Sequence, residues 1–487
     1  MTRTALLLSL ALLLASSAVR ADEVHYENFR YGQRAMGAGG AMVAFPGEPE
    51  ASWYNPAALA LIQGTRLSGS LQFFGSERHT LTDGLRSQTT GNTDLTSSDV
   101  LLLPSSSVLS YAFGADDQHV IALSSFLVSE RDETFSDTIE TRLIDGNQWL
   151  DQSLTFTRQD IDRIVYIGPS WAWRSTPTFT LGLSVFYARR EQNAQALTSF
   201  TEQRRQQDSG ALLSTTFDDT LASTTIDDGA LLARLGVLVV QGRLSFGATA
   251  TTQSIALHGS GRLAYTFTDS GDPADTSGLN PNNPDPFREL VNVSDVDAQT
   301  IYPWNFAAGL AYRVPSRWAV ASQVSVYLPS QYDRLELNAS QQELIANSLV
   351  NRVERQWVVN GALGAEWYAT ARVPLRFGAF TNRSAAPDIP SNPTMLMLPK
   401  VDLYGVTTSV GFIGDKRAIN IGAEVQWGRG HDVVLNDVRQ IWRPAFVRVD
   451  REQFRAVLFL SGAIDFAAKT AQDLVEERPS PQPSPNP

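Results

Sequence analysis

Ala418-Ile419-Asn420-Ile421-Gly422-Ala423-Glu424-Val425-Gln426-Trp427 is the stretch that decides the fold of this chain. Apolar residues fill the odd-numbered positions from Ile419 to Trp427, and polar or small residues fill the even-numbered ones. A period of two indicates a β-strand with two unlike faces. Because the second face carries a charge in mid-strand, Glu424, we expect the apolar face to contact lipid and the other face to line a lumen.

The same alternation recurs in segment after segment beyond residue 64. A charged residue on the lipid side of a membrane strand costs roughly 2–4 kcal/mol at mid-membrane, whereas a lumen tolerates it. Tryptophans cluster near the ends of the segments, as in the aromatic girdles of membrane barrels. We therefore expect the mid-strand charged residues to face the lumen, where they are candidates for contact with a ligand or with a plug: Arg234, Glu366, Arg376, Glu424 and Arg455.

The alternation predicts fourteen strands. They span residues 64–78, 100–114, 117–131, 161–174, 177–192, 229–241, 243–258, 297–313, 317–332, 353–369, 372–383, 400–414, 417–430 and 453–466.

The links between these segments alternate between short turns and long loops. The long ones are 79–99, 132–160, 193–228, 259–296, 333–352, 384–399 and 431–452. Short turns on one side and long loops on the other, with an even strand number, are typical of outer-membrane barrels. The sequence therefore predicts an all-β fold, a transmembrane antiparallel β-barrel of about fourteen strands over residues 63–466. A soluble all-β protein is the alternative.

The N-terminus has the layout of a secretory signal peptide. Arg3 provides the basic start, an Ala/Leu-rich core runs from Ala5 to Ala15, and Val19-Arg20-Ala21 fits a cleavage site. We expect residues 1–21 to direct Sec-type export and the mature chain to reside in the outer membrane. The Pro-rich end, residues 467–487, is expected to be an extended periplasmic tail.

Composition excludes several classes of protein. The chain has 487 residues and no cysteine, which rules out disulfide modules, Cys-ligated metal sites and thiol enzymes. Its net charge of −12 argues against a nucleic-acid partner. The five histidines have no metal-ligand spacing, so we expect no metal, no cofactor and no enzymatic activity. A lipase built on His258 and Ser260 is a remote alternative.

A fourteen-stranded barrel needs something inside it. Eight strands fill their interior with side chains, whereas sixteen to eighteen leave an aqueous channel. Residues 22–62 are the available filling, and we expect them to form an N-terminal plug. Their motifs are a glycine-rich stretch with Gly37, Gly39 and Gly40, which permits close packing, and Asn55-Pro56-Ala57, which starts a short helix.

These two motifs, placed between a signal peptide and a fourteen-stranded barrel, resemble the FadL family of outer-membrane transporters for long-chain fatty acids and other hydrophobic compounds. Gly32, Arg34 and Ala35 also fit the glycine-rich stretch of that family. The resemblance implies passive diffusion of a hydrophobic compound, fatty acid-like or aromatic, through a monomeric plugged barrel. It also implies a lateral exit through the wall into the lipid of the outer membrane.

The family resemblance directs attention to two further features. In that family the third and fourth outer loops form the capture groove. The corresponding loops here, 193–228 and 259–296, are mostly polar; the apolar candidates in the first are Leu197, Phe200, Leu212, Leu213, Phe217 and Leu221. In that family the third strand is also kinked at the lateral opening. Here a bulge at Ser124-Ser125 would bring Phe126 and Val128 back to the lipid face.

The alternative function is a scaffold. A barrel of the same shape could hold partner proteins at the cell surface, and the long polar loops would suit that role. Neither the motifs nor the strand pattern distinguishes fatty acids from aromatic hydrocarbons.

Overall fold

The computed structural model describes residues 24–87, 91–270, 287–339, 342, 350–436 and 445–466. The predicted signal peptide, 1–21, and the predicted tail, 467–487, lie outside these residues. Within them, no helix is both long enough and apolar enough to cross a bilayer.

Fourteen antiparallel strands close into a barrel, which confirms the predicted fold class. In the ring each strand pairs with the next one along the chain, β7 pairs with β10, β11 with β14, and β18 returns to pair with β1. The ring strands are β1 (Thr65–Ser87), β2 (Gly91–Phe113), β3 (His119–Asp145), β4 (Gln148–Thr176), β5 (Phe179–Gln206), β6 (Leu212–Gln241), β7 (Leu244–Thr251), β10 (Asn305–Val314), β11 (Trp318–Tyr327), β14 (Val358–Thr370), β15 (Val373–Asn382), β16 (Lys400–Ile413), β17 (Arg417–Leu435) and β18 (Phe446–Asp465).

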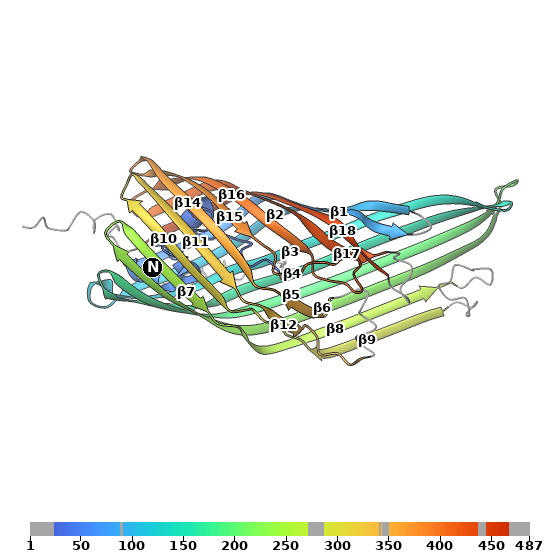
Figure 1. Ribbon diagram of the computed structural model, residues 1–487, viewed down its shortest axis with the longest axis horizontal. Coiled ribbons are helices and arrows are strands. Elements are labelled where there is room, and N and C mark those ends of the chain that lie inside the picture. Colours follow the sequence, from blue (N-terminus) through green and yellow to red (C-terminus); the bar gives the residue numbers. More distant parts are fainter. Residues whose placement is uncertain are drawn as a thin grey trace, which may run out of the picture.

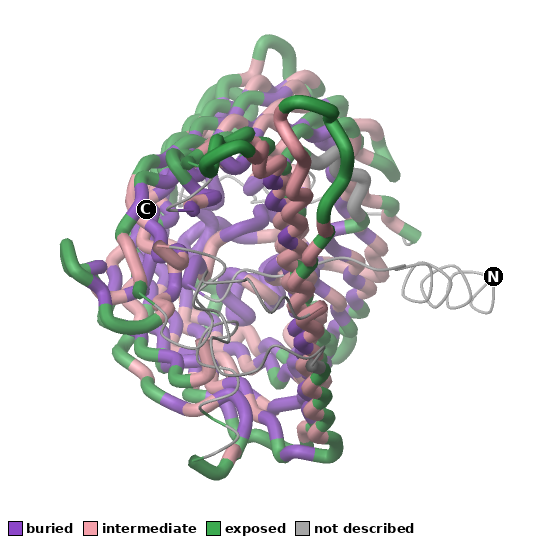
Figure 2. The backbone as a smooth tube through the Cα atoms, turned by 90° about the vertical axis from the view of Figure 1, so that its right-hand side faces the viewer, coloured by how far each residue is buried: buried purple, intermediate pink, exposed green. Residues whose placement is uncertain are grey.

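The wall has an apolar outer face and a polar inner face. On β17, Ile419 and Ile421 are 48% and 45% exposed, whereas Asn420 and Glu424 are 0% and 4% exposed. Figure 2 shows buried residues gathered inside the ring. The exposed tryptophans include Trp171, Trp304, Trp318, Trp357, Trp367 and Trp427. So continuous an apolar surface would be unfavourable in water, so this face is the one that contacts acyl chains.

Four neighbouring strands, β3 to β6, are far longer than a membrane requires. They have 27 to 30 residues, whereas about 9–11 residues cross a bilayer. Figure 1 shows them extending well beyond β1 and β18 at the end opposite the short turns.

The predicted long loops are therefore wrong in part, because 79–99, 132–160 and 193–228 consist mainly of continued strand. Above the membrane the outer face of these strands meets water, so the apolar alternation weakens there while the backbone ladder continues. Threonine and serine pairs mark the extension, as between Thr138 Oγ1 and Thr155 Oγ1 at 2.9 Å.

Two predicted strands are each divided. The segment 243–258 ends as a wall strand at Thr251, and β8 (Ile255–Asp269) then pairs with the outer half of β6. Strand β9 (Phe287–Asp297) adds to β8, so the predicted loop 259–296 is partly a hairpin. The segment 353–369 divides into β13 (Arg352–Arg355), which pairs with β12 (Ser330–Asp333), and β14.

An arginine placed on the lipid face tests the orientation of the wall. Val324 lies on the outer face in the middle of β11 and is half exposed. We expect Val324→Arg to lower the free energy of unfolding by about 2–4 kcal/mol, because the guanidinium enters the acyl region. Urea-dependent folding into lipid vesicles, followed by tryptophan fluorescence, measures the change.

The matched control puts the same side chain on the outer face of the extension. Gln195 lies on β5 above the membrane and is exposed. Gln195→Arg should leave the urea midpoint almost unchanged, and an equal loss in both variants would contradict the assignment of the outer face to lipid.

Candidate functional site

Residues 24–62, called the lumen segment below, lie inside the barrel and run along its axis. Val24 packs against Tyr332 and Val353 near the outer ends of the strands, and Ile62 directly precedes the inner end of β1. Between them the segment forms three short helices, α2 (Gln33–Gly37), α3 (Ala51–Tyr54) and the 3-10 helix η1 (Pro56–Leu61). Most of its residues are buried.

The glycine-rich stretch lies against the wall at backbone distance. Gly39 has a φ of +63°, and a Cβ there would lie 2.9 Å from the backbone nitrogen of Ala379. On the other side of this contact, a Cβ on Gly378 of β15 would lie 2.0 Å from the nitrogen of Gly39. Glycine on both sides therefore permits the contact. Gly37 packs beside Ser409, and Gly40 has a φ of +83°.

The Asn55-Pro56-Ala57 motif fixes the second contact with the wall. Asn55 is fully buried, and its Oδ1 accepts a hydrogen bond from the nitrogen of Ala57 at 3.1 Å, which makes it the N-cap of η1. Its Nδ2 donates to the carbonyl oxygens of Val43 at 2.7 Å and Val237 at 2.9 Å. One amide thus joins two parts of the lumen segment to β6.

Buried ion pairs connect the lumen segment to inward-facing charges of the wall. Glu366 on β14 accepts from Arg34 Nε at 3.2 Å and from Arg376 Nε at 2.6 Å. On β17, Glu424 Oε1 accepts from Arg30 Nη1 at 3.1 Å. An arginine of the lumen segment therefore neutralises each of these two carboxylates, as their burial requires.

The two remaining inward arginines make different contacts. Arg455 Nη2 donates to Gln72 Oε1 at 2.5 Å, and its guanidinium lies over the ring of Phe29. Arg234 Nε donates to Thr251 Oγ1 at 2.9 Å, and its guanidinium carbon lies 4.7 Å from the ring centre of Trp53. All five predicted lumen residues do face inward; their roles toward a ligand stay predictions.

Aromatic side chains fill the lumen around Trp53. The Trp53 ring lies 5.3 Å from Tyr31 and from Phe126, and 5.6 Å from Tyr166. Phe186 completes the cluster. These rings give the inner half of the lumen an apolar lining, in contrast to the charged level above it.

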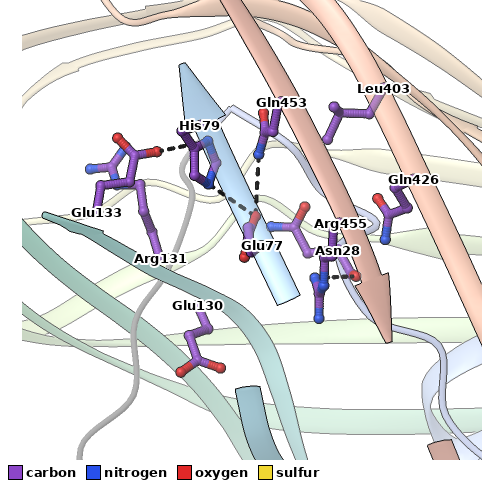
Figure 3. A pocket seen from close by; sticks show the side chains of 10 residues that line it. All are labelled: Asn28, Glu77, His79, Glu130, Arg131, Glu133, Leu403, Gln426, Gln453 and Arg455. Carbon is purple, nitrogen blue, oxygen red and sulfur yellow. Dashed lines mark hydrogen bonds and ion pairs between the residues drawn. The ribbon is translucent and has the colours of Figure 1, made fainter. Parts of the chain in front are cut away.

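Two cavities lie on either side of residues 28–30. The outer one has about 20 Å³ of free space and a charged lining. Figure 3 shows His79 between Glu77 and Glu133, with Arg455 beside Asn28. The inner one has about 40 Å³ of free space and is lined by Trp53, Tyr54 and Arg234, among others. Neither holds more than a few water molecules.

An ion cluster and an apolar cluster close the lumen above the outer cavity. Arg451 on β18 bonds Glu133 of β3, and its Nη1 donates to Asp432 Oδ2 at 2.8 Å. Burial alone would raise the pKa of Glu133, but Arg451 and its cationic neighbours lower it to about 2. Above them lies an apolar cluster of Leu81, Leu85, Leu95, Phe135, Leu154, Phe200, Val434 and Val449.

The apolar residues predicted to form the capture groove lie on different faces of the strands. Phe200 belongs to the apolar cluster inside the lumen, whereas Leu197 and Leu221 pair with each other on the outer face of the extension. They do not form one groove, because alternate residues of a strand point to opposite faces.

The predicted bulge at Ser124-Ser125 is wrong in position. Ser124 and Ser125 pair regularly with both neighbouring strands, and the register shifts at Val128 instead. Phe126 consequently points inward and is fully buried against Tyr31, instead of facing lipid. The two apolar pairs of β3 differ in parity because the second one faces the lumen.

The backbone pairing between β2 and β3 ends at the level of Phe126. Among the residues that the structure describes, the ladder runs from Phe113 opposite His119 to Ser106 opposite Phe126 and ends there. The lumen segment bonds to β3 just above: Tyr31 donates its hydroxyl to the carbonyl of Leu127 at 2.5 Å, and Asn28 Nδ2 donates to Ser129 Oγ at 2.7 Å.

The roles of several residues of this site were not predicted from the sequence. Arg30 and Arg34 are opposite in charge to Glu424 and Glu366. The sequence contains these charges, but only the structure shows which of them pair. Wall glycines such as Gly378 and Gly236 lie where the lumen segment touches the strands. The aromatic cluster has no signal in the sequence, because its members come from four distant segments.

Replacement of Asn55 tests the attachment of the lumen segment. In Asn55→Ala the carbonyls of Val43 and Val237 lose a donor at a buried site, which costs about 1–3 kcal/mol each. We expect proteolysis of the folded protein in detergent to cut the lumen segment faster. Gln72→Ala, which removes one contact to Arg455 and none to η1, is the control. An unchanged rate in Asn55→Ala would contradict the anchoring role.

Glu50 gives the lumen segment a pH dependence. It is buried beside Gly32, and burial followed by the neighbouring Glu48 carboxylate raises its pKa to about 7. Between pH 4.5 and 7 the unfolded chain loses this proton while the folded protein keeps it, so stability falls as the pH rises. Thermal unfolding in detergent should show a smaller decrease over this range in Glu50→Gln than in the wild type. The control Glu140→Gln, at an exposed position, should behave like the wild type. If the unfolding temperature of Glu50→Gln fell with pH as much as that of the wild type, the raised pKa of Glu50 would be refuted.

Comparisons with known proteins agree with this geometry. Over residues 12–452 the chain matches the family described as outer membrane protein transport protein (OMPP1/FadL/TodX). Similar solved structures include a FadL homologue of Pseudomonas aeruginosa, with 14% identity, a TM-score of 0.59 and coverage of 91% of this chain and 100% of the other. The CymD monoaromatic hydrocarbon channel has 11% identity, a TM-score of 0.51 and coverage of 91% and 99%. The toluene transporter TodX of P. putida has 14% identity, a TM-score of 0.50 and coverage of 90% and 99%.

At these identities the solved structures establish the fold alone. Among curated proteins, none matches the chain in sequence. The family match, however, spans most of the chain and includes both the lumen segment and nearly all of the wall. The chain therefore belongs to the OMPP1/FadL/TodX family of outer-membrane transport proteins.

Proposed function

We propose that this protein carries hydrophobic small molecules across the outer membrane by passive diffusion, as a monomer and without a cofactor. In this proposal residues 1–21 direct export, 22–62 form a plug, 63–466 form the barrel and 467–487 a periplasmic tail. The structural relatives carry compounds such as toluene, and the apolar rings around Trp53 are compatible with an aromatic or an aliphatic cargo.

The plug role rests on the way the lumen segment is held. It contacts the wall through hydrogen bonds, buried ion pairs and glycine contacts, all of which are reversible. The two cavities beside it are too small for a benzene ring, which needs a cavity of about 150 Å³. Passage of cargo therefore requires part of the segment to move.

The observation that carries the proposal is the interrupted pairing of β2 and β3. There the lumen segment binds β3 instead: Tyr31 bonds the backbone carbonyl of Leu127, and Asn28 bonds the side chain of Ser129. Further out, the two strands meet again through Ser97 Oγ, which accepts from the nitrogen of Thr134 at 3.0 Å. Displacement of Tyr31 would open the wall between these levels toward lipid, which is the lateral exit.

A disulfide across this opening tests the lateral exit. The chain has no cysteine, so Ser97→Cys with Thr134→Cys adds a single possible bridge at the outer end of the opening. Cells carrying the variant are offered labelled toluene, benzoate and decanoate. We expect oxidation to reduce at least severalfold the uptake of whichever compounds enter, and reduction to restore it.

The control bridge joins Ser107 and Ser125, which lie opposite each other in the intact ladder between the same two strands. It should leave uptake unchanged in both redox states. If the outer bridge is equally harmless, the exit lies elsewhere. If none of the three compounds enters faster than in cells without the protein, the transport function itself is refuted.

A further inference from the structure

Arg234 differs from Arg376 and Arg30 in its contacts. Arg376 and Arg30 each contact a carboxylate, at 2.6 and 3.1 Å. Arg234 donates a hydrogen bond from Nε to the hydroxyl of Thr251, and its guanidinium lies over the ring of Trp53. Within the described residues, no carboxylate oxygen lies within 4 Å of its nitrogens. Arg234 is also one of the residues that line the inner cavity.

A guanidinium at this depth is expensive without an anionic partner. Removing an ion from water costs several kcal/mol, and only an opposite charge or good hydrogen bonds offset it. Ionisable residues at membrane depth accordingly mark binding or transport sites. The free donors of Arg234 match the two oxygens of a carboxylate, which arginine binds with paired hydrogen bonds.

Aromatic side chains make up part of the cavity wall, together with polar ones such as Asn305, Gln323 and Ser325. Trp53, Tyr54 and Phe29 line it from the lumen segment, and Tyr327 lines it from β11. Flat rings of this kind favour another ring by stacking or edge contacts. The cavity therefore places aromatic faces and one unpaired cation within the same small volume.

The lumen segment itself occupies part of this space with the same two chemical groups. The ring of Tyr26 stacks on Tyr327 with centroids 4.3 Å apart and planes 18° from parallel. The next residue, Glu27, accepts a hydrogen bond through Oε1 from the Tyr327 hydroxyl at 3.2 Å. An aromatic ring followed by a carboxylate thus fills the part of the cavity next to Arg234.

We propose that the inner cavity is a binding site for aromatic carboxylates, and that Tyr26 and Glu27 occupy it as an internal substitute in the absence of ligand. The ring of the ligand takes the place of Tyr26 against Tyr327 and Trp53, and its carboxylate takes the terminal nitrogens of Arg234. The proposal rests on the transport function and specifies its substrate class.

Calorimetric titration of the full-length protein in detergent, with benzoate as the probe, tests this. Arg234→Met should weaken benzoate binding at least tenfold, as expected for loss of a charge-assisted pair, and Arg234→Lys should weaken it less. Tyr26→Ala and Glu27→Gln should strengthen it, because each removes part of the internal competitor. Toluene, which lacks the carboxylate, should bind wild type and Arg234→Met alike.

The control is Arg372→Met, which removes an exposed arginine in the turn between β14 and β15 and should not change the affinity. Heat-dependent gel migration shows whether each variant is folded, and Arg234→Lys keeps the test valid if Arg234→Met is not. Equal benzoate affinity in wild type and a folded Arg234 variant overturns the proposal.

Tighter binding of decanoate than of benzoate also overturns it, since the site would then select aliphatic acids. Uptake of toluene without any binding of benzoate refutes the substrate class alone and leaves the transport function standing. Absence of uptake for all three compounds refutes the transport function instead.

Discussion

Neutralisation of the wall's inward charges by the lumen segment is the interaction on which this structure depends. Fourteen strands enclose a lumen too wide for wall side chains alone, and Glu366 and Glu424 project into it at membrane depth. Arg34 and Arg30 of the lumen segment neutralise them. The same contacts place Trp53, Tyr31 and Asn55, and so form the two cavities and support the weak seam between β2 and β3.

The sequence predicted the wall well because lipid imposes a strict rule on it. Because Glu424 lies on the second face, the apolar face of Ile419 to Trp427 is expected to contact lipid. The short turns between such segments then give the number of strands. The extension of β3 to β6 could not be predicted in this way. The outer face of its strands meets water, so serine and threonine pairs there replace the apolar period that reveals a membrane strand.

The site was predictable only in part. Asn55-Pro56 and the glycine-rich stretch are local signals, and the structure places both at contacts with the wall. The bulge on β3 was misplaced because Phe126 was assumed to face lipid, whereas the lumen segment provides an apolar surface inside for it to pack against. Likewise the pairing of Arg34 with Glu366 depends on two segments more than three hundred residues apart, which no local pattern relates.

Single-channel conductance in a planar bilayer tests the central claim most directly, since it reports whether the lumen is sealed. The account predicts a silent baseline for the wild type and intermittent ion currents for Arg34→Glu, which brings two carboxylates together at Glu366 and loosens the lumen segment. A steady open-pore current in the wild type, or an equally silent baseline in both proteins, would contradict it.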